Sequence, residues 1–140
     1  MKLTDILREQ PLKNSKHDNI IRMIDNHITT SPNVLTMFKS AYFKISNHDK
    51  TWEGDIDYLA MLYDSKKYEV FGWEEVPVGD NTLLLFEVKT NDTSKGYHKA
   101  LSQLRKESDL IKTFTPYQSI DCFYAFGVGK GYSFRVEEEL

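Results

Sequence analysis

The segment Leu83–Lys89 reads Leu-Leu-Leu-Phe-Glu-Val-Lys and decides the fold of this 140-residue chain. Its first four residues are all apolar, which is typical of a central strand that is covered on both faces of a sheet. Side chains two residues apart on a strand share a face, so Glu87 and Lys89 should project together while Val88 packs behind them. We therefore predict a buried strand that ends in two opposite charges.

Helical and extended patterns surround this strand. Ser15 is a candidate N-cap for a helix that reaches about Asn26, because isoleucines recur there at helical spacing. A second helix is expected over 95–112, after cap residues at 91–94. The range 34–39 fits a short helix or a strand equally well. Strands are predicted over 42–45, 56–63, 68–76, 120–128 and 132–136, the last two joined by a turn at Gly129-Lys130-Gly131.

Size and composition point to one folded domain. Strands before and after a long helix favour an α/β fold in which helices pack on the faces of a mixed sheet. The chain is 40% apolar and 28% charged, which is ordinary for a globular protein. No apolar stretch approaches the roughly 20 residues of a membrane span, and the N-terminus has no signal-peptide core. With a single cysteine, Cys122, we expect an intracellular, cytoplasmic protein that has no membrane partner.

The charge distribution is uneven. A net charge of −3 counts against binding nucleic acid through bulk electrostatics. Basic residues nevertheless gather after the central strand, where they could form a local basic face, and four of them are candidate nucleic-acid contacts: Lys95, Lys99, Arg105 and Lys106.

Two motifs carry a family resemblance, Gly54-Asp55-Ile56-Asp57 and Glu87-Val88-Lys89. They resemble the PD-(D/E)xK nuclease superfamily, which includes type II restriction enzymes, RecB-like nucleases and archaeal Holliday junction resolvases. In that family an Asp on one strand is followed by Glu-x-Lys on the next. The first motif is similar to the family's Gly-Glu-Ile-Asp, which assigns the Asp to Asp57, with Asp55 as second choice. The resemblance implies a single restriction-endonuclease-like domain with a mixed central sheet flanked by helices.

Two further correspondences are weaker. The family often has a supporting Gln in the helix after Glu-x-Lys, a role that Gln103 could fill, although a solvated helix position explains it equally well. The first helix of the family commonly supplies a Glu, and spacing aligns His17 with that position here. His17 or the neighbouring Asp18 could bind metal or water instead.

The resemblance implies a metal-dependent reaction. Mg²⁺ prefers oxygen ligands and keeps several waters, so Asp57 and Glu87 would hold it beside a phosphodiester, joined by the backbone carbonyl of Val88. Mn²⁺ should substitute. Lys89 would position or deprotonate the attacking water and stabilise the charge that develops on the phosphate.

The expected activity is hydrolysis of DNA, most of all structured or branched DNA as in recombination and repair, by a chain that could form a homodimer. RNA stays open as a substrate. Two alternatives fit the same residues. One is an inactive nucleic-acid-binding or assembly module with the same fold, and the other is an unrelated α/β interaction protein in which Glu87 and Lys89 form only an ion pair at a strand end.

Overall fold

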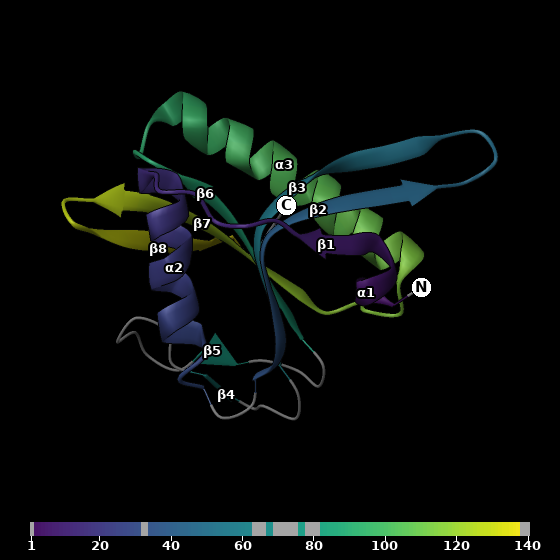
Figure 1. Cartoon of the computed structure of the whole chain (residues 1–140), viewed down its shortest axis with the longest axis horizontal. Helices are drawn as coiled ribbons and strands as arrows, with labels where there is room; N and C mark the ends of the chain where they lie inside the picture. Colours follow the sequence, from purple (N-terminus) through teal and green to yellow (C-terminus); the bar gives the residue numbers. More distant parts are fainter. Residues whose placement is uncertain (1, 32–33, 63–66, 69–75, 78–81, 138–140) are drawn as a thin grey trace.

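A mixed sheet runs through the middle of the molecule in the computed structural model, which describes residues 2–31, 34–62, 67–68, 76–77 and 82–137 (Figure 1). Short elements open the chain, α1 (Leu3–Ile6) and β1 (Leu7–Glu9). They are followed by α2 (Lys16–Ile28), β2 (Val34–Ser46), β3 (Thr51–Leu62), β4 (Lys67–Tyr68), β5 (Val76–Pro77), β6 (Leu83–Lys89), α3 (Ser94–Phe114), β7 (Ile120–Val128) and β8 (Gly131–Glu137).

The strand order explains why β6 is apolar on both faces. The six-stranded sheet has the order β1-β2-β3-β6-β7-β8, which places β6 between β3 and β7. Strand β6 pairs antiparallel with β3 and parallel with β7. A parallel pair requires a crossover connection, which α3 supplies. The chain is thus an α/β protein with a central mixed sheet, as the sequence predicted.

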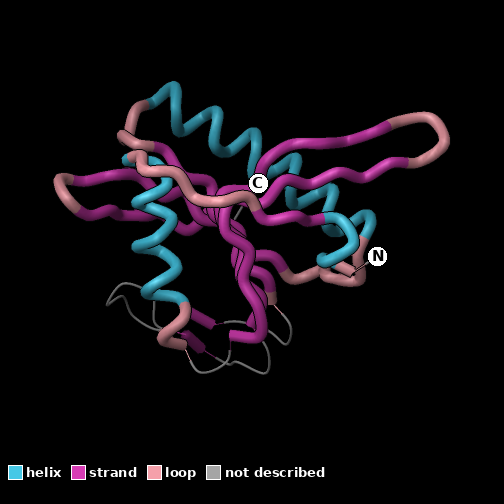
Figure 2. The backbone as a smooth tube through the Cα atoms, in the orientation of Figure 1, coloured by secondary structure: helices cyan, strands magenta, loops and turns pink. Residues whose placement is uncertain are grey.

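Helices α2 and α3 cover opposite faces of this sheet, so the domain has two apolar cores (Figure 2). Alternate residues of β6 divide between them: Leu83 and Leu85 pack on the α3 side, whereas Leu84, Phe86 and Val88 pack on the α2 side. Continuing this alternation carries Glu87 and Lys89 to the α3 side of the sheet.

Most predicted elements are confirmed, some with different limits. Helix α2 has Ser15 as its N-cap, and α3 begins after the cap Thr93. The undecided range 34–39 is a strand that continues through 42–45, because it pairs with residues 58–62 of β3. Strand β3 begins at Thr51, earlier than predicted. The sequence did not predict α1 and β1.

The predicted strand over 68–76 needs correction at its ends. Tyr68 and Val76 pair with each other, antiparallel, in a separate two-stranded sheet, so the two ends of that range belong to different strands. Residues 69–75 lie outside the described residues.

The β2–β3 hairpin is irregular where Asp57 lies. Ile56 and Tyr58 would share a face in a regular strand, yet Ile56 packs in the core under α3 and Tyr58 in the core under α2. Across the hairpin Ser40 has φ 49°, a left-handed conformation that is uncommon outside glycine. The ladder pairs Lys39 with Tyr58 and then Ala41 with Ile56, passing over Ser40 and Asp57. This local twist releases the Asp57 side chain from the regular alternation.

No helix among the described residues is long and apolar enough to cross a membrane.

Candidate functional site

The end of β6 presents one buried and one accessible charge. Glu87 is 4% exposed, whereas the Lys89 side chain retains about a quarter of its accessible surface. Lys89 Nζ lies 3.6 Å from Glu87 Oε1, so the two side chains share a face as the strand alternation predicted. Val88 lies behind them in the core on the α2 side.

Asp57 reaches the same place from β3. Its Oδ2 atom accepts a hydrogen bond of 2.8 Å from the backbone N–H of Val88, which holds the carboxylate against the end of β6. The structure therefore brings Asp57 and Glu87 together across neighbouring strands. Asp57 meets the amide of Val88 here, and a role for the Val88 carbonyl remains a prediction.

Helix α2 contributes two side chains, His17 and Asp18, that continue from Asp57 of β3. His17 Nε2 lies 3.4 Å from Asp57 Oδ1, and His17 Nδ1 lies 2.9 Å from Asp18 Oδ1. The hydrogen bond to Asp57, with the charges of Asp57 and Asp18, outweighs burial and raises the pKa of His17 to about 9. His17 is thus a cation at neutral pH, positioned between two carboxylates.

Asp18 faces away from Asp57 and serves the start of α2. Its Oδ2 atom accepts a hydrogen bond of 2.6 Å from the backbone N–H of Lys13, and its own N–H donates to Ser15 Oγ. With one oxygen on Lys13 and the other on His17, Asp18 orients the imidazole. Of the two first-helix candidates, the structure therefore brings His17 to Asp57 and places Asp18 behind it.

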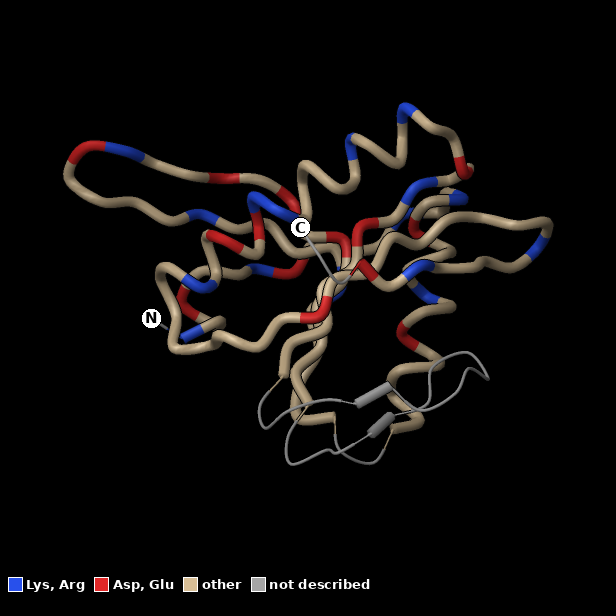
Figure 3. Tube along the Cα trace, turned by 180° about the vertical axis from the view of Figure 1, so that it is seen from behind, with Lys and Arg blue, Asp and Glu red and all other residues tan. Residues whose placement is uncertain are grey.

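Helix α3 brings Gln103 to the site. Lys89 Nζ donates a hydrogen bond of 3.3 Å to Gln103 Oε1, while Gln103 itself is exposed to solvent. The four predicted nucleic-acid contacts are all exposed and lie on the same helix: Lys95, Lys99, Arg105 and Lys106. Figure 3 shows blue positions recurring along this helix. Lys95 and Lys99 are one turn apart and Lys106 returns to their side, whereas Arg105 points to a different flank.

Asp55, the second choice for the strand carboxylate, is exposed and pairs with Tyr42 in the β2–β3 hairpin. It lies outside the contacts that join Asp57, Glu87 and Lys89, and its charge acts on the site from a distance.

Sequence reasoning missed Glu107, which is 4% exposed on α3. Residues Ala100, Leu104 and Ile111 are buried on this helix, and Glu107 occupies the same stripe at the spacing i+7 from Ala100. An acid on an apolar stripe was therefore the available signal. Burial, helped by the negative charge of Asp57, raises the pKa of Glu107 to about 9.

Glu87 and Glu107 carry the only side-chain atoms among the described residues that are buried without a hydrogen-bond partner, the Oε2 atom of each. Burial and then the charges of Asp57 and Glu107 raise the pKa of Glu87 well above its usual range. A buried oxygen without a partner is costly. Glu87 and Glu107 therefore each have one buried oxygen with unused acceptor capacity.

The carboxylate oxygens of Asp57 and Glu87 are ligands that suit a hard divalent cation. Asp57 and Glu87 supply carboxylate oxygens from adjacent strands, and the unpartnered Glu87 oxygen has capacity for a further ligand bond. Within the described ranges, no three His, Cys, Asp or Glu side chains are placed so that together they could hold a metal ion. Cation binding would require these side chains to draw together.

Comparisons with protein-family models, with curated proteins and with solved structures found no match to this chain.

Proposed function

We propose that this protein is a metal-dependent nuclease that hydrolyses phosphodiester bonds in DNA. The observation that carries the proposal is the meeting of Asp57, Glu87 and Lys89 at the end of one buried strand. Glu-x-Lys alone is a weak signal, because opposite charges alternate on many strands. Here Glu87 is buried, and Asp57 on the adjacent strand accepts a hydrogen bond from the N–H of Val88. Gln103 on α3 contacts Lys89.

The four elements that the PD-(D/E)xK resemblance assigns to the site meet at one place, which supports the proposal. His17 of α2 contacts Asp57 of β3, and Gln103 of α3 contacts Lys89 of β6. The residues that make these contacts span 86 positions of the sequence, from His17 to Gln103 (103 − 17). Nearness along the chain therefore does not explain why they meet.

Each residue has a distinct role in this proposal. Asp57 and Glu87 would hold Mg²⁺ or Mn²⁺, which supplies Lewis-acid activation of a water and of the phosphate. Lys89, held by Gln103 and partly open to solvent, would position the attacking water and stabilise negative charge on the phosphate. His17 would orient Asp57.

Positive charge on two sides of the site supports an anionic polymer as substrate. The exposed lysines of α3 lie on one side. On the other, a polar groove at the start of α2 is lined by Lys16 and by Lys130 of the β7–β8 turn, and Lys16 Nζ lies 3.3 Å from Asn91 Oδ1, just after β6. Lysines at these positions could bind the phosphates of a DNA backbone. Contacts to phosphates carry no sequence information, so such a protein would recognise the shape of the DNA more than its sequence. We propose that the substrate is structured or branched DNA and that a homodimer makes paired cuts in it.

The test is cleavage of labelled linear, single-stranded, flapped and four-way-junction DNA with Mg²⁺, Mn²⁺ or EDTA. Glu87→Gln should reduce cleavage to the EDTA level, and Lys89→Ala should slow it by about 100-fold or more while metal binding is retained. Asp109→Asn, an exposed acid on α3, is the matched control and should cleave normally. Equal cleavage by all variants would exclude this site. Light scattering of the protein with and without junction DNA tests the dimer.

A second candidate function has one observation in its favour. His17 Nε2 already lies 3.4 Å from Asp57 Oδ1, at the carboxylate that would bind a metal ion in an active nuclease. An inactive module that binds nucleic acid without cutting it would tolerate this arrangement. Intact DNA in every metal condition, together with a band shift that weakens steeply as salt rises, would favour this function.

A further inference from the structure

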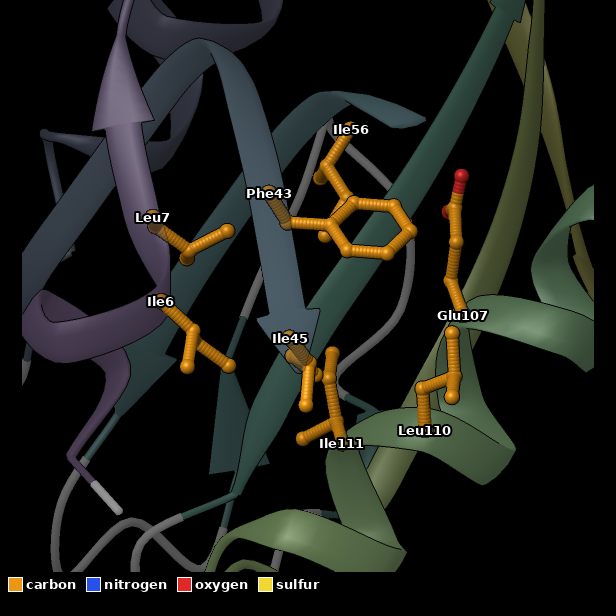
Figure 4. A pocket seen from close by; sticks show the side chains of 8 residues that line it. All are labelled: Ile6, Leu7, Phe43, Ile45, Ile56, Glu107, Leu110 and Ile111. Atoms are coloured by element: carbon orange, nitrogen blue, oxygen red, sulfur yellow. The ribbon is translucent and has the colours of Figure 1, made fainter. Parts of the chain in front are cut away.

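Glu107 is a buried acid that the proposed nuclease chemistry does not use. It lines a narrow cavity of about 10 Å³, about the size of one water, together with seven apolar residues from α1, β1, β2, β3 and α3: Ile6, Leu7, Phe43, Ile45, Ile56, Leu110 and Ile111. Figure 4 shows the Glu107 side chain rising past the ring of Phe43, away from Leu110 and Ile111. The apolar cavity therefore gives the carboxylate no polar partner.

The helix register places Glu107 beside the candidate metal ligands. Gln103 and Glu107 are four residues apart on α3 and so lie on one side of the helix. Gln103 contacts Lys89 Nζ, and that nitrogen lies 3.6 Å from Glu87 Oε1. The charges of Asp57, Asp55 and Lys89 all act on Glu107, and the charge of Glu107 acts on Glu87. The Glu107 carboxylate thus belongs to the group formed by Asp57 and Glu87.

Two buried carboxylates that each have an unpartnered oxygen need protons or a cation. A neutral, purely structural acid of this kind normally donates its proton to an acceptor, yet Glu107 Oε2 and Glu87 Oε2 have no hydrogen-bond partner in the described part of the chain. A cation between them would occupy both oxygens at once and offset the cost of burying the charges.

We propose that Glu107 is a third carboxylate ligand of the divalent cation held by Asp57 and Glu87, supplied by α3 from outside the Asp and Glu-x-Lys motifs. The inference rests on the proposed metal-dependent function of the site. Cation binding would then join β3, β6 and α3 through one ion. It would also require the three side chains to move closer together, because as they stand no three acidic side chains among the described residues are placed to hold an ion.

The test is Mn²⁺ binding to the full chain by isothermal titration calorimetry, with no DNA present. Glu107→Gln keeps the shape of the side chain and removes its charge, and it should weaken Mn²⁺ binding by about tenfold or more. Glu87→Gln should weaken binding at least as much. Asp109→Asn changes an exposed acid two residues along the same helix and should bind within about twofold of the wild type.

The outcomes separate the two proposals. If Glu87→Gln loses Mn²⁺ and Glu107→Gln binds like the wild type, the inference is wrong and the proposed site stands. If the wild type binds no Mn²⁺, both are wrong. Should Glu107→Gln fail to fold by circular dichroism, ¹³C NMR of the wild-type side-chain carboxyls during a Mg²⁺ titration replaces it. Glu107 and Glu87 signals that shift along one binding curve support the inference, and a Glu107 signal that stays in place overturns it.

Discussion

The two helices that cover the sheet each bury one carboxylate. These two carboxylates differ in their hydrogen-bond partners and in the direction in which their pKa is shifted. Asp18 on α2 is 8% exposed, and both of its oxygens have partners, the Lys13 N–H and His17. Its hydrogen bonds to His17 and Lys13 outweigh burial and lower the pKa of Asp18. Glu107 on α3 is 4% exposed, has an unpartnered oxygen, and has a raised pKa.

Burial by itself therefore does not indicate whether an acid is structural. The Asp18 side chain has both oxygens bound, holds the backbone of Lys13 at the start of α2 and orients His17. Glu107 is affected by the charges of Asp57 and Asp55, and its unpartnered oxygen has capacity for a ligand. Removal of the Asp18 carboxylate should therefore lower stability, whereas removal of the Glu107 carboxylate should change how stability depends on pH.

The largest effect is expected from Asp18→Ala. The substitution leaves the Lys13 N–H and the His17 ring without their acceptor, so the free energy of unfolding should fall by about 2–3 kcal/mol. Urea unfolding followed by tryptophan fluorescence measures it, with Asp109→Ala as a control that should stay within about 0.5 kcal/mol of the wild type. A loss no larger than that of the control would show that Asp18 is not the structural acid described above.

Glu107→Gln should change how stability depends on pH. Glu107 has a pKa of about 9 in the folded chain and an ordinary value of 4.5, so the folded state keeps a proton that the unfolded state releases. In EDTA the free energy of unfolding should therefore fall as pH rises from 6 to 9, and Glu107→Gln should reduce this slope by about 1 kcal/mol per pH unit.

His17 adds to the same slope. Its contribution is complete below its ordinary pKa of 6.5 and is lost as pH rises through about 9, so the slope should shrink without vanishing in Glu107→Gln. Urea titrations at pH 6, 7, 8 and 9 give the result. An unchanged slope in the variant would mean that Glu107 is ionised in the folded, cation-free protein.

A smaller effect concerns His17 itself. Asp57→Asn should lower the pKa of His17 from about 9 toward its ordinary value, and Asp18→Asn should lower it less, because the hydrogen bond to Asp57 is the largest cause of the shift. NMR titration of the imidazole signals measures both. Asp25→Asn, on the same helix, should leave the His17 pKa in place, and a larger shift from Asp18→Asn than from Asp57→Asn would reverse the assigned roles.

The smallest effect is expected from Gln103→Ala. Gln103 is exposed, and its contact with Lys89 at 3.3 Å is a surface hydrogen bond, so stability should change by less than about 0.5 kcal/mol. The same urea assay checks it. A loss above about 1 kcal/mol would mean that Gln103 helps to hold α3 on the sheet and is more than a local support for Lys89.

Local patterns predicted much of the fold. The apolar run before Glu87 indicated the central strand, Ser15 and Thr93 begin the two long helices, and the Gly129-Lys130-Gly131 turn joins β7 to β8. Residues 34–39 could not be decided, because a short apolar run has no clear period and its strand identity depends on pairing with β3. The short α1 and β1 were missed for a similar reason: β1 exists through its pairing with β2.

The candidate site divides in the same way. Residues of a single element were readable from spacing, as for Glu87 and Lys89 on one face of β6, and the choice of Asp57 came from the family resemblance. The irregularity of the β2–β3 hairpin at Asp57 could not be predicted from the residues around Asp57, since it also involves Ser40 on the opposite strand. Helical spacing places Glu107 on the apolar stripe of α3. An acid at such a position indicates a site only when the surface that packs against it is also acidic, and the spacing does not reveal that surface.

The sequence by itself determined that the chain has a central strand covered on both faces, two amphipathic helices and a pair of opposite charges at the end of that strand, because these follow from periods of 2.0 and 3.6 residues. Tertiary structure alone decided which charges from different elements meet. It placed His17 against Asp57 and left one buried oxygen each of Glu87 and Glu107 without a hydrogen-bond partner, because desolvation and hydrogen-bond partners depend on what packs against a side chain and not on its neighbours in the chain.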